Sequence, residues 1–216
     1  MNTLRLKYQT IEFGNLDIHV RSLRDHLQYQ DPHGKAEKLG ISSATWPLFG
    51  VLWDSSRVLA HLMSEFEVAG KRILEVGCGI GLASLVLNHR RANIWATDYH
   101  PEAESFLLEN IKLNAGPSIP FVRTGWGDPK TDLGVFDLLI GSDLLYERDH
   151  SDLLSAFIDQ HAAPQCQVII VDPGRGNHGR FSRRMGERGY THTRIRPDTS
   201  AYLAKPFSGY ILGYKR

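Results

Sequence analysis

The stretch from Arg72 to Asp98 constrains the fold of this chain more than any other. It opens with residues 73–76, a short apolar run typical of a strand buried on both faces. Three glycines follow at alternate positions, Gly77, Gly79 and Gly81. Apolar residues then recur at helical spacing, and a second apolar run ends in Asp98. A glycine turn before a helix lets a ligand approach the backbone, and the later acid can accept hydrogen bonds from ribose hydroxyls. The stretch therefore predicts a nucleoside site.

The spacing of the glycines separates two classes of nucleoside ligand. A dinucleotide turn has the pattern G-x-G-x-x-G, which would need a glycine at Leu82. Glu75 instead stands two residues before the first glycine, an order that resembles motif I of the S-adenosylmethionine (SAM)-dependent methyltransferases with a seven-stranded sheet. The resemblance implies that the glycines make room for SAM and that Glu75 orients the loop and its ligand. Leu82 disfavours a nucleotide-dependent oxidoreductase. The alternative is a glycine turn that only closes a strand–helix unit.

Composition narrows the class of protein further. A chain of 216 residues can form one domain with a substantial core. Its formal net charge of +1 gives no strong field to recruit nucleic acid or a membrane, and no apolar run approaches the length of a membrane span. Two cysteines are too few for a disulfide framework, and the first residues carry no signal-like apolar core. We therefore expect a soluble cytoplasmic monomer without nucleic-acid or membrane partners.

Strand and helix patterns alternate along the chain, which predicts a parallel sheet covered on both faces. We expect a hairpin over residues 4–24, a loop over 28–43 and a helix over 51–66. Later strands are expected at 120–124, 136–140 and 167–171, before a closing antiparallel pair at 190–196 and 207–214. The resemblance implies an α/β, Rossmann-like seven-stranded sheet in the order 3-2-1-4-5-7-6, with strand 7 antiparallel. We divide the chain into an N-terminal extension (1–50) and a methyltransferase domain (51–216).

Ligands of open parallel sheets bind beyond the carboxyl ends of the strands, so the residues there are the site candidates. Asp143 and Tyr146 follow the fourth expected strand. A carboxylate and a phenol can hold a neutral amine in line for methyl transfer and accept the cation that forms. Nucleic-acid amino-methyltransferases have Pro-Pro where this chain has Leu144 and Leu145. A 5-methylcytosine enzyme needs a nucleophilic cysteine at this end of the sheet, whereas Cys166 lies before the fifth expected strand, at the far end. The alternative is a capping aspartate with a core tyrosine.

Taken together, these motifs resemble the seven-β-strand lysine methyltransferases that act on calmodulin, valosin-containing protein and the electron-transfer-flavoprotein β-subunit. The resemblance covers roughly residues 46–176 and includes Val51 to Asp54, Trp126 and Asp172 to Arg175. It implies SAM as cofactor, S-adenosylhomocysteine as product, and Asp143 and Tyr146 as the catalytic residues. The implied cofactor-binding residues are Trp53, Glu75, Gly77, Cys78, Gly79, Gly81, Asp98, Tyr99, Trp126 and Ser142.

Three of these assignments carry specific alternatives. Trp53 resembles the tryptophan that meets the methionine end of SAM, but a core tryptophan fits as well. Trp126 is expected over the adenine, against a simple surface turn, and Gly125 departs from the aspartate usual before this tryptophan. The basic residues from Arg175 to Arg188 would steer an acidic protein substrate, or form a solvated helix face.

The function that follows is SAM-dependent methylation of lysine on an intracellular protein. A small-molecule N- or O-methyltransferase is the first alternative. Such enzymes commonly insert a segment that covers the site, whereas here only residues 1–50 are available for this, which leaves the site rather open. A non-catalytic SAM-binding or partner-binding module is the second. The ten histidines show no ligand spacing, so we expect no metal.

Overall fold

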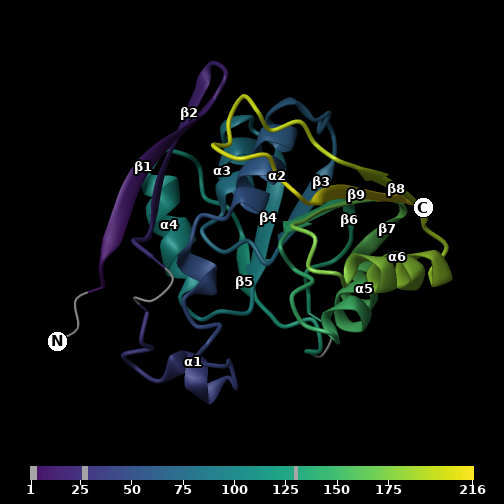
Figure 1. Ribbon diagram of the computed structural model, residues 1–216, viewed down its shortest axis with the longest axis horizontal. Helices are drawn as coiled ribbons and strands as arrows, with labels where there is room; N and C mark the ends of the chain where they lie inside the picture. The colour runs from purple at the N-terminus through teal and green to yellow at the C-terminus, as the bar shows by residue number, and fades with distance from the viewer. Residues whose placement is uncertain (1–3, 26–28, 129–130) are drawn as a thin grey trace.

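Strands and helices alternate through most of the computed structural model, which describes residues 4–25, 29–128 and 131–216 (Figure 1). The strands are β1 (Leu6–Phe13), β2 (Leu16–Leu23), β3 (Arg72–Val76), β4 (Asn93–Asp98), β5 (Phe121–Arg123), β6 (Phe136–Ser142), β7 (Ala162–Asp172), β8 (Thr191–Ile195) and β9 (Tyr210–Lys215). The helices are α1 (Lys35–Lys38), α2 (Asp54–Glu65), α3 (Leu82–His89), α4 (Ala103–Leu113), α5 (His150–His161) and α6 (His178–Glu187), with a 3-10 turn at Leu48–Gly50.

The central sheet has seven strands in the order β5-β4-β3-β6-β7-β9-β8. Strands β3 to β7 run parallel, whereas β9 is antiparallel to both β7 and β8. Counted from β3, this is the predicted order 3-2-1-4-5-7-6 with its antiparallel seventh strand, so the predicted fold class is confirmed. The strand order reverses between β4 and β6, on either side of β3, which places the switch point of the sheet at the end of β3.

Helices cover both faces of the sheet because its central strands are apolar on both sides. Ile73 and Ile140 pack with residues of α2, α3 and α4 in one cluster of buried side chains. Leu74 and Leu139 point to the opposite face and pack with residues of α5 and α6 in a second cluster. Successive strand residues alternate between the two faces, as the two-residue period of a strand requires. Neither face of the central strands β3 and β6 is left to solvent, which explains their continuous apolar runs, whereas every residue of the edge strand β8 is exposed.

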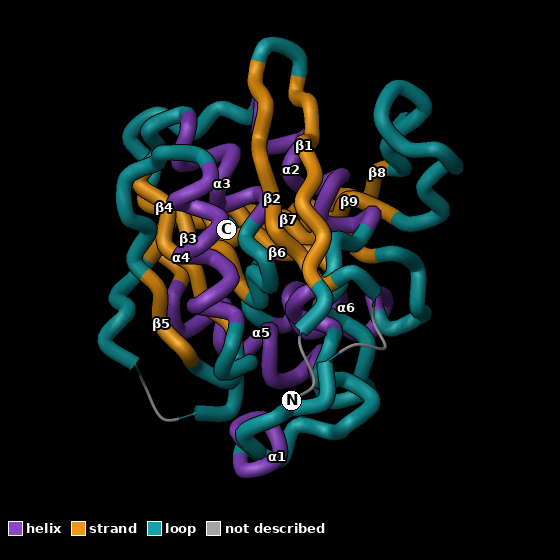
Figure 2. Tube along the Cα trace, turned by 90° about the vertical axis from the view of Figure 1, so that its left-hand side faces the viewer, coloured by secondary structure: helices purple, strands orange, loops and turns teal. Residues whose placement is uncertain are grey.

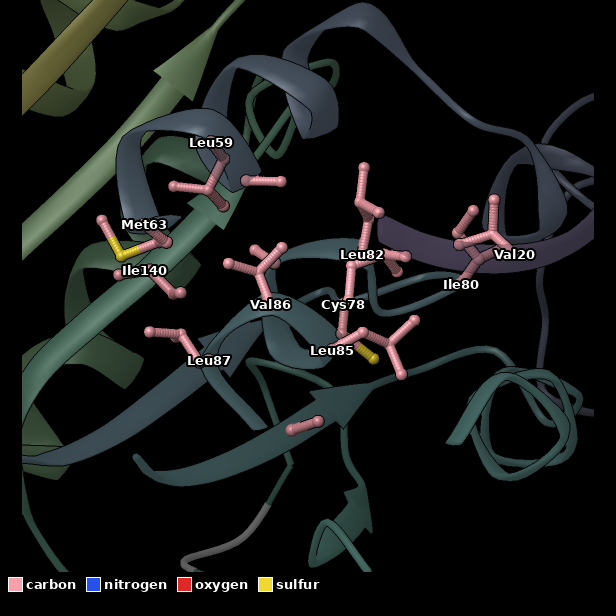
Figure 3. Packing of buried hydrophobic residues seen from close by; sticks show 14 of the residues in the cluster. Val20, Leu59, Met63, Cys78, Ile80, Leu82, Leu85, Val86, Leu87 and Ile140 are labelled. Carbon is pink, nitrogen blue, oxygen red and sulfur yellow. The ribbon is translucent and has the colours of Figure 1, made fainter. Parts of the chain in front are cut away.

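The hairpin of β1 and β2 forms a separate two-stranded sheet whose tip projects beyond the main body (Figure 2). Its inward side chains Ile18 and Val20 are fully buried and belong to the same cluster as α2 and α3. Figure 3 shows Val20 near Ile80 and Leu82, while Leu59 and Met63 of α2 approach Ile140. The hairpin predicted around Gly14 is therefore present and shares the main core. The domain boundary at residue 50 stays a prediction.

Three predicted elements differ in extent from those observed. The expected loop over 28–43, whose first residue lies outside the described part, contains α1, because both carboxylate oxygens of Asp31 accept backbone N–H groups of its first turn at 2.9 Å. The helix expected from Val51 begins at Asp54, since residues 51 and 53 are extended after the 3-10 turn. Strand β7 begins at Ala162, so Cys166 lies within it rather than before it, and packs in the second cluster.

Candidate active site

A cavity of about 560 Å³ opens where the carboxyl ends of β3, β4 and β6 meet. This volume lies in the range typical of small-molecule sites. All but two of the residues predicted for the site line it: Trp53, Gly77, Cys78, Gly79, Asp98, Tyr99, Trp126, Ser142, Asp143 and Tyr146. The fold thus brings together side chains that the sequence separates by more than ninety positions, as expected for residues at the ends of parallel strands.

The glycine turn after β3 brings bare backbone to the cavity. Gly77 and Gly79 have φ angles of 62° and 55°, which side chains rarely adopt. A Cβ atom on Gly79 would lie 2.8 Å from the carbonyl oxygen of Phe49, and one on Gly77 would lie 2.5 Å from Leu144 Cδ2. Glycine is therefore required at both positions, and the backbone between them remains open to a ligand.

Glu75 and Gly81 are the two predicted site residues that do not line the cavity. Glu75 is 2% exposed, and its carboxylate accepts hydrogen bonds from the backbone N–H of Ser84, at 2.9 Å, and from the Ser84 hydroxyl. Burial raises the pKa of Glu75 to about 7. Gly81 precedes α3 in the left-handed conformation. Both residues hold the turn against α3 from behind, and direct contact with a cofactor stays a prediction for them.

Asp98 fixes the glycine turn from the neighbouring strand. Its Oδ2 accepts the N–H of Gly79 at 2.8 Å, and its Oδ1 accepts the N–H of His100 at 2.8 Å. Burial raises the pKa of this carboxyl. The N–H of Tyr99 also hydrogen-bonds this carboxylate, whose two oxygens have four lone pairs between them, so one remains for a further donor in the cavity. Asp98 can therefore hold the loop and accept a hydrogen bond from a ligand at the same time.

The N-terminal segment closes one side of the cavity. Ile41, Thr45 and Leu48 line it, and the Tyr99 hydroxyl donates to the Leu39 carbonyl oxygen at 2.7 Å. The sequence analysis expected a rather open site and did not foresee that residues 39–48 cover one side of the cavity. Sequence patterns missed it because the contacts join residues about sixty positions apart and the segment has almost no periodic structure.

Below that segment, Phe49 and His100 stack with ring centroids 3.8 Å apart. His100 is 5% exposed, and burial lowers its pKa to about 4, so the ring is neutral near pH 7. Both rings line the cavity. Neither residue was predicted. The available signal was the position of His100, two residues after a strand that ends in an acid.

Asp143 is held at the mouth of the cavity by an arginine from the next strand end. Its Oδ1 accepts from Arg175 Nε at 2.8 Å, and its Oδ2 accepts from Arg175 Nη2 at 2.8 Å. Asp143 has a φ of 54°, an uncommon conformation for a residue other than glycine. The bidentate pair fixes the carboxylate plane. The sequence placed Arg175 in a basic stretch and gave no sign of this partner.

Tyr146 stands at the outer edge, with 43% of its surface exposed. Burial of its hydroxyl, together with the Asp98, Glu147 and Asp143 carboxylates, raises the pKa of Tyr146 to about 12. The phenol is therefore protonated at neutral pH and can both donate and accept a hydrogen bond.

His150, which the sequence analysis missed, supports the aromatic side chains at this edge. Its ring meets Tyr146 edge-on with centroids 4.5 Å apart and Trp126 with centroids 4.9 Å apart. Its Nδ1 lies 2.8 Å from the carbonyl oxygen of Leu144, so this nitrogen is the donor. Trp53 is positioned in a similar way, since its Nε1 donates to the Leu48 carbonyl oxygen at 2.9 Å.

A family model described as lysine methyltransferase (Methyltransf_16) matches residues 38–184. The chain belongs to this family. The matched region covers the glycine turn, Asp98, Asp143 and Arg175, and begins inside the expected N-terminal extension. The interpretation of the sequence as a member of the SAM-dependent lysine methyltransferase group is confirmed at the level of the family.

Individual proteins similar to this chain are also lysine methyltransferases. The protein N-lysine methyltransferase METTL21A of Danio rerio is 32% identical over 139 residues, covering 59% of this chain and 63% of that protein. The electron transfer flavoprotein beta subunit lysine methyltransferase of Rattus norvegicus is 29% identical over 133 residues, covering 60% and 51%. The chain thus spans between half and two thirds of the length of these relatives.

Solved structures agree with the fold. A methyltransferase from Pyrococcus furiosus superposes with a TM-score of 0.59 at 20% identity, covering 74% of this chain and 81% of that one. The 16S rRNA N2 G1207 methyltransferase of T. thermophilus gives a TM-score of 0.67 at 12% identity, covering 98% and 51%. At these identities the likeness concerns the fold alone.

Two further observations concern metals and membranes. Among the described residues, Glu147, Asp149 and His150 offer ligand atoms within 4.8 Å of one another. The two acids are exposed, and such groups are common without an ion, so the absence of a metal stays a prediction. In the described part of the chain, no helix is both long enough and apolar enough to cross a membrane.

Proposed function

We propose that this chain transfers a methyl group from SAM to the side-chain amine of lysine in a protein. The observation that carries the proposal is one cavity that joins the glycine turn and Asp98 to Asp143 and Tyr146. Membership of the lysine methyltransferase family supports the choice of acceptor.

The residues at the inner end of the cavity suit SAM. The Asp98 carboxylate keeps a lone pair for a ribose hydroxyl, and the turn from Gly77 to Gly79 offers backbone to the methionine part. Trp126 and Tyr99 offer ring surface for the adenine, and Trp53, Cys78 and Ser142 complete the proposed contacts. Bound SAM supplies a methyl group on a positively charged sulfur, and S-adenosylhomocysteine is the product.

The residues at the mouth suit an amine. Methyl transfer to nitrogen requires a neutral amine whose lone pair points along the line of displacement. The Asp143 carboxylate can accept an N–H of the amine and orient it, because Arg175 occupies only one lone pair of each oxygen. The Tyr146 oxygen can accept a second N–H. Both oxygens then lie where positive charge develops on nitrogen, which lowers the barrier.

The proposal is tested with tritiated SAM and an extract of the source cells, comparing the wild type with Asp143→Asn. The two side chains have nearly the same shape, so the variant removes the charge and leaves the fold. We expect one labelled protein band with the wild type and at least roughly a tenfold loss of label with the variant, at unchanged SAM affinity by calorimetry. Label confined to small molecules would instead support the small-molecule N- or O-methyltransferase.

We also propose the cytoplasm, or another reducing compartment, as the site of action, and a monomeric enzyme. Support comes from Cys78 and Cys166, which are both buried free thiols. Size-exclusion chromatography with light scattering tests the monomer directly, and a dimeric mass would contradict it.

A further inference from the structure

A second, shallow cleft lies between α6 and β8, at the end of the sheet beyond β7. Figure 1 shows α6 beside β8 and β9 in the right-hand part of the molecule. The cleft has a volume of about 810 Å³. Its ionisable lining residues are His178, Arg183, His192 and Arg194, and the described residues that line it include no acid. A chain of net charge +1 therefore concentrates positive charge in this place.

The arginines of α6 divide into two that form ion pairs and one, Arg183, for which the described part of the chain shows no ion pair. Arg180 and Arg184 both form ion pairs with Asp152 of α5, and Arg184 also contacts Glu187 at 2.9 Å. These contacts tie α6 to α5 and leave little free charge. Arg183 points the other way, into the cleft, and its side chain is exposed. The arginines of α6 thus form one structural face, packed against α5, and one face open to the cleft.

On the opposite wall, Arg194 is held in place by Tyr210, which lies outside the cleft lining and also holds Arg196. The guanidinium carbons of Arg194 and Arg196 lie 4.8 Å and 5.3 Å from the ring centroid of Tyr210. Arg196 Nη2 also donates to the Tyr210 hydroxyl at 3.1 Å, and Arg194 Nη1 lies 3.4 Å from His178 Nε2. Guanidinium groups held in this way lose less conformational freedom when they bind a carboxylate, so the cleft wall is prepared for anions.

The cleft opens at the same edge of the sheet as the cavity. β9 is antiparallel to both β7 and β8, so β8 runs parallel to β7. The carboxyl end of β8, with Arg194 and Arg196, therefore lies at the edge where β7 ends in Asp172. His178 lines the cleft, and its Nδ1 lies 3.8 Å from Oδ1 of the buried Asp172, three residues before Arg175, which lines the cavity. A chain with its lysine at Asp143 could continue into the cleft.

We propose that the cleft between α6 and β8 binds an acidic segment of the protein substrate, next to the lysine that is methylated. This inference rests on the proposed function and adds the class of substrate. Protein carboxylates fit better than a nucleic acid, because the bases of single strands stack on open aromatic rings, whereas the Tyr210 ring is already covered by two guanidinium groups.

The direct test is fluorescence anisotropy with a short fluorescein-labelled poly-glutamate peptide and the purified full chain. The double variant R183E/R194E reverses the charge of both cleft walls. Its matched control, R5E/K7E, makes the same charge change on exposed residues of the hairpin segment. We expect wild type and control to bind the peptide in a salt-sensitive way, and the cleft variant to bind at least roughly tenfold more weakly. Circular dichroism of each variant verifies that it is folded.

In the binding assay, any of three results would overturn the proposal: a wild type that does not bind the peptide, a control that loses as much affinity as the cleft variant, or tighter binding of a single-stranded oligonucleotide of equal charge. Labelling of the extract with tritiated SAM separates this inference from the proposed function. If the wild type labels no protein but binds the peptide through the cleft, the proposed function fails and the cleft remains an acidic-peptide site. If R183E/R194E labels the same band at the wild-type rate, the substrate role of the cleft is wrong.

Discussion

At the scale of single residues, Asp98 has two roles that one substitution can remove. Asp98→Ala deletes the acceptors for the N–H of Gly79 and of His100 as well as the one for the ribose. Each lost hydrogen bond to a charged group costs about 1.5–3 kcal/mol, so we expect SAM affinity to fall by roughly a hundredfold or more. Isothermal titration calorimetry measures this directly. Asp17→Ala, in an exposed position of the hairpin, is the control, and unchanged affinity in Asp98→Ala would remove Asp98 from the cofactor site.

Arg175 acts through Asp143 rather than on the methyl donor. Arg175→Gln leaves the Asp143 carboxylate without its bidentate partner and free to rotate. We expect SAM affinity to be retained while turnover with labelled extract falls roughly tenfold, because the amine is then less well aligned. Arg175→Lys keeps the charge but lacks the planar fork, so it should recover only part of the rate. If Arg175→Gln turned over at the wild-type rate, the ion pair would have no part in positioning.

At the scale of elements, the sequence predicted what local patterns encode. The glycine turn, Asp98 and the strand ends were predictable, because strand and helix periods are short and parallel strands align their carboxyl ends. The pair of Asp143 and Arg175 was not, since it joins residues 32 positions apart through the neighbouring ends of β6 and β7. Helix α1 was missed for another reason: four residues are too few for a periodic pattern, and Asp31, which accepts N–H groups of its first turn, lies three positions before the N-cap Gly34.

The buried link between β3 and α3 predicts a pH effect on stability. Glu75 has a pKa raised to about 7 in the folded chain, against an ordinary value of 4.5. Because the folded state holds this proton more tightly, the contribution of protonated Glu75 is complete below pH 4.5 and is lost as the pH rises through about 7. Glu75→Gln does not titrate. We therefore expect the stability of the wild type to fall relative to Glu75→Gln by up to about 3 kcal/mol across this window.

Urea unfolding of both proteins at several pH values checks this difference. Asp17→Asn serves as the control, because its exposed side chain should give a pH profile like that of the wild type. A constant difference between wild type and Glu75→Gln across the window would show that Glu75 is ionised throughout.

At the scale of the whole molecule, the N-terminal hairpin raises the question of how many units fold together. Ile18 is fully buried and belongs to the cluster that includes α2 and α3, so the hairpin and the main sheet share one core. Tyr8, on the same hairpin, is 63% exposed and makes a matched control. If the core is continuous, a substitution that destabilises the hairpin must also destabilise the main sheet.

We therefore expect Ile18→Ala to lower the free energy of unfolding of the entire chain by about 2–5 kcal/mol, the cost of truncating a fully buried isoleucine. Tyr8→Ala should change it far less. Circular dichroism reports on all elements, whereas tryptophan fluorescence reports on Trp46, Trp53, Trp95 and Trp126, which all lie outside the hairpin. Coincident urea transitions by both probes, shifted together in Ile18→Ala, would establish one cooperative unit. A shift seen by circular dichroism alone would mean that the hairpin of β1 and β2 unfolds separately from the rest of the chain.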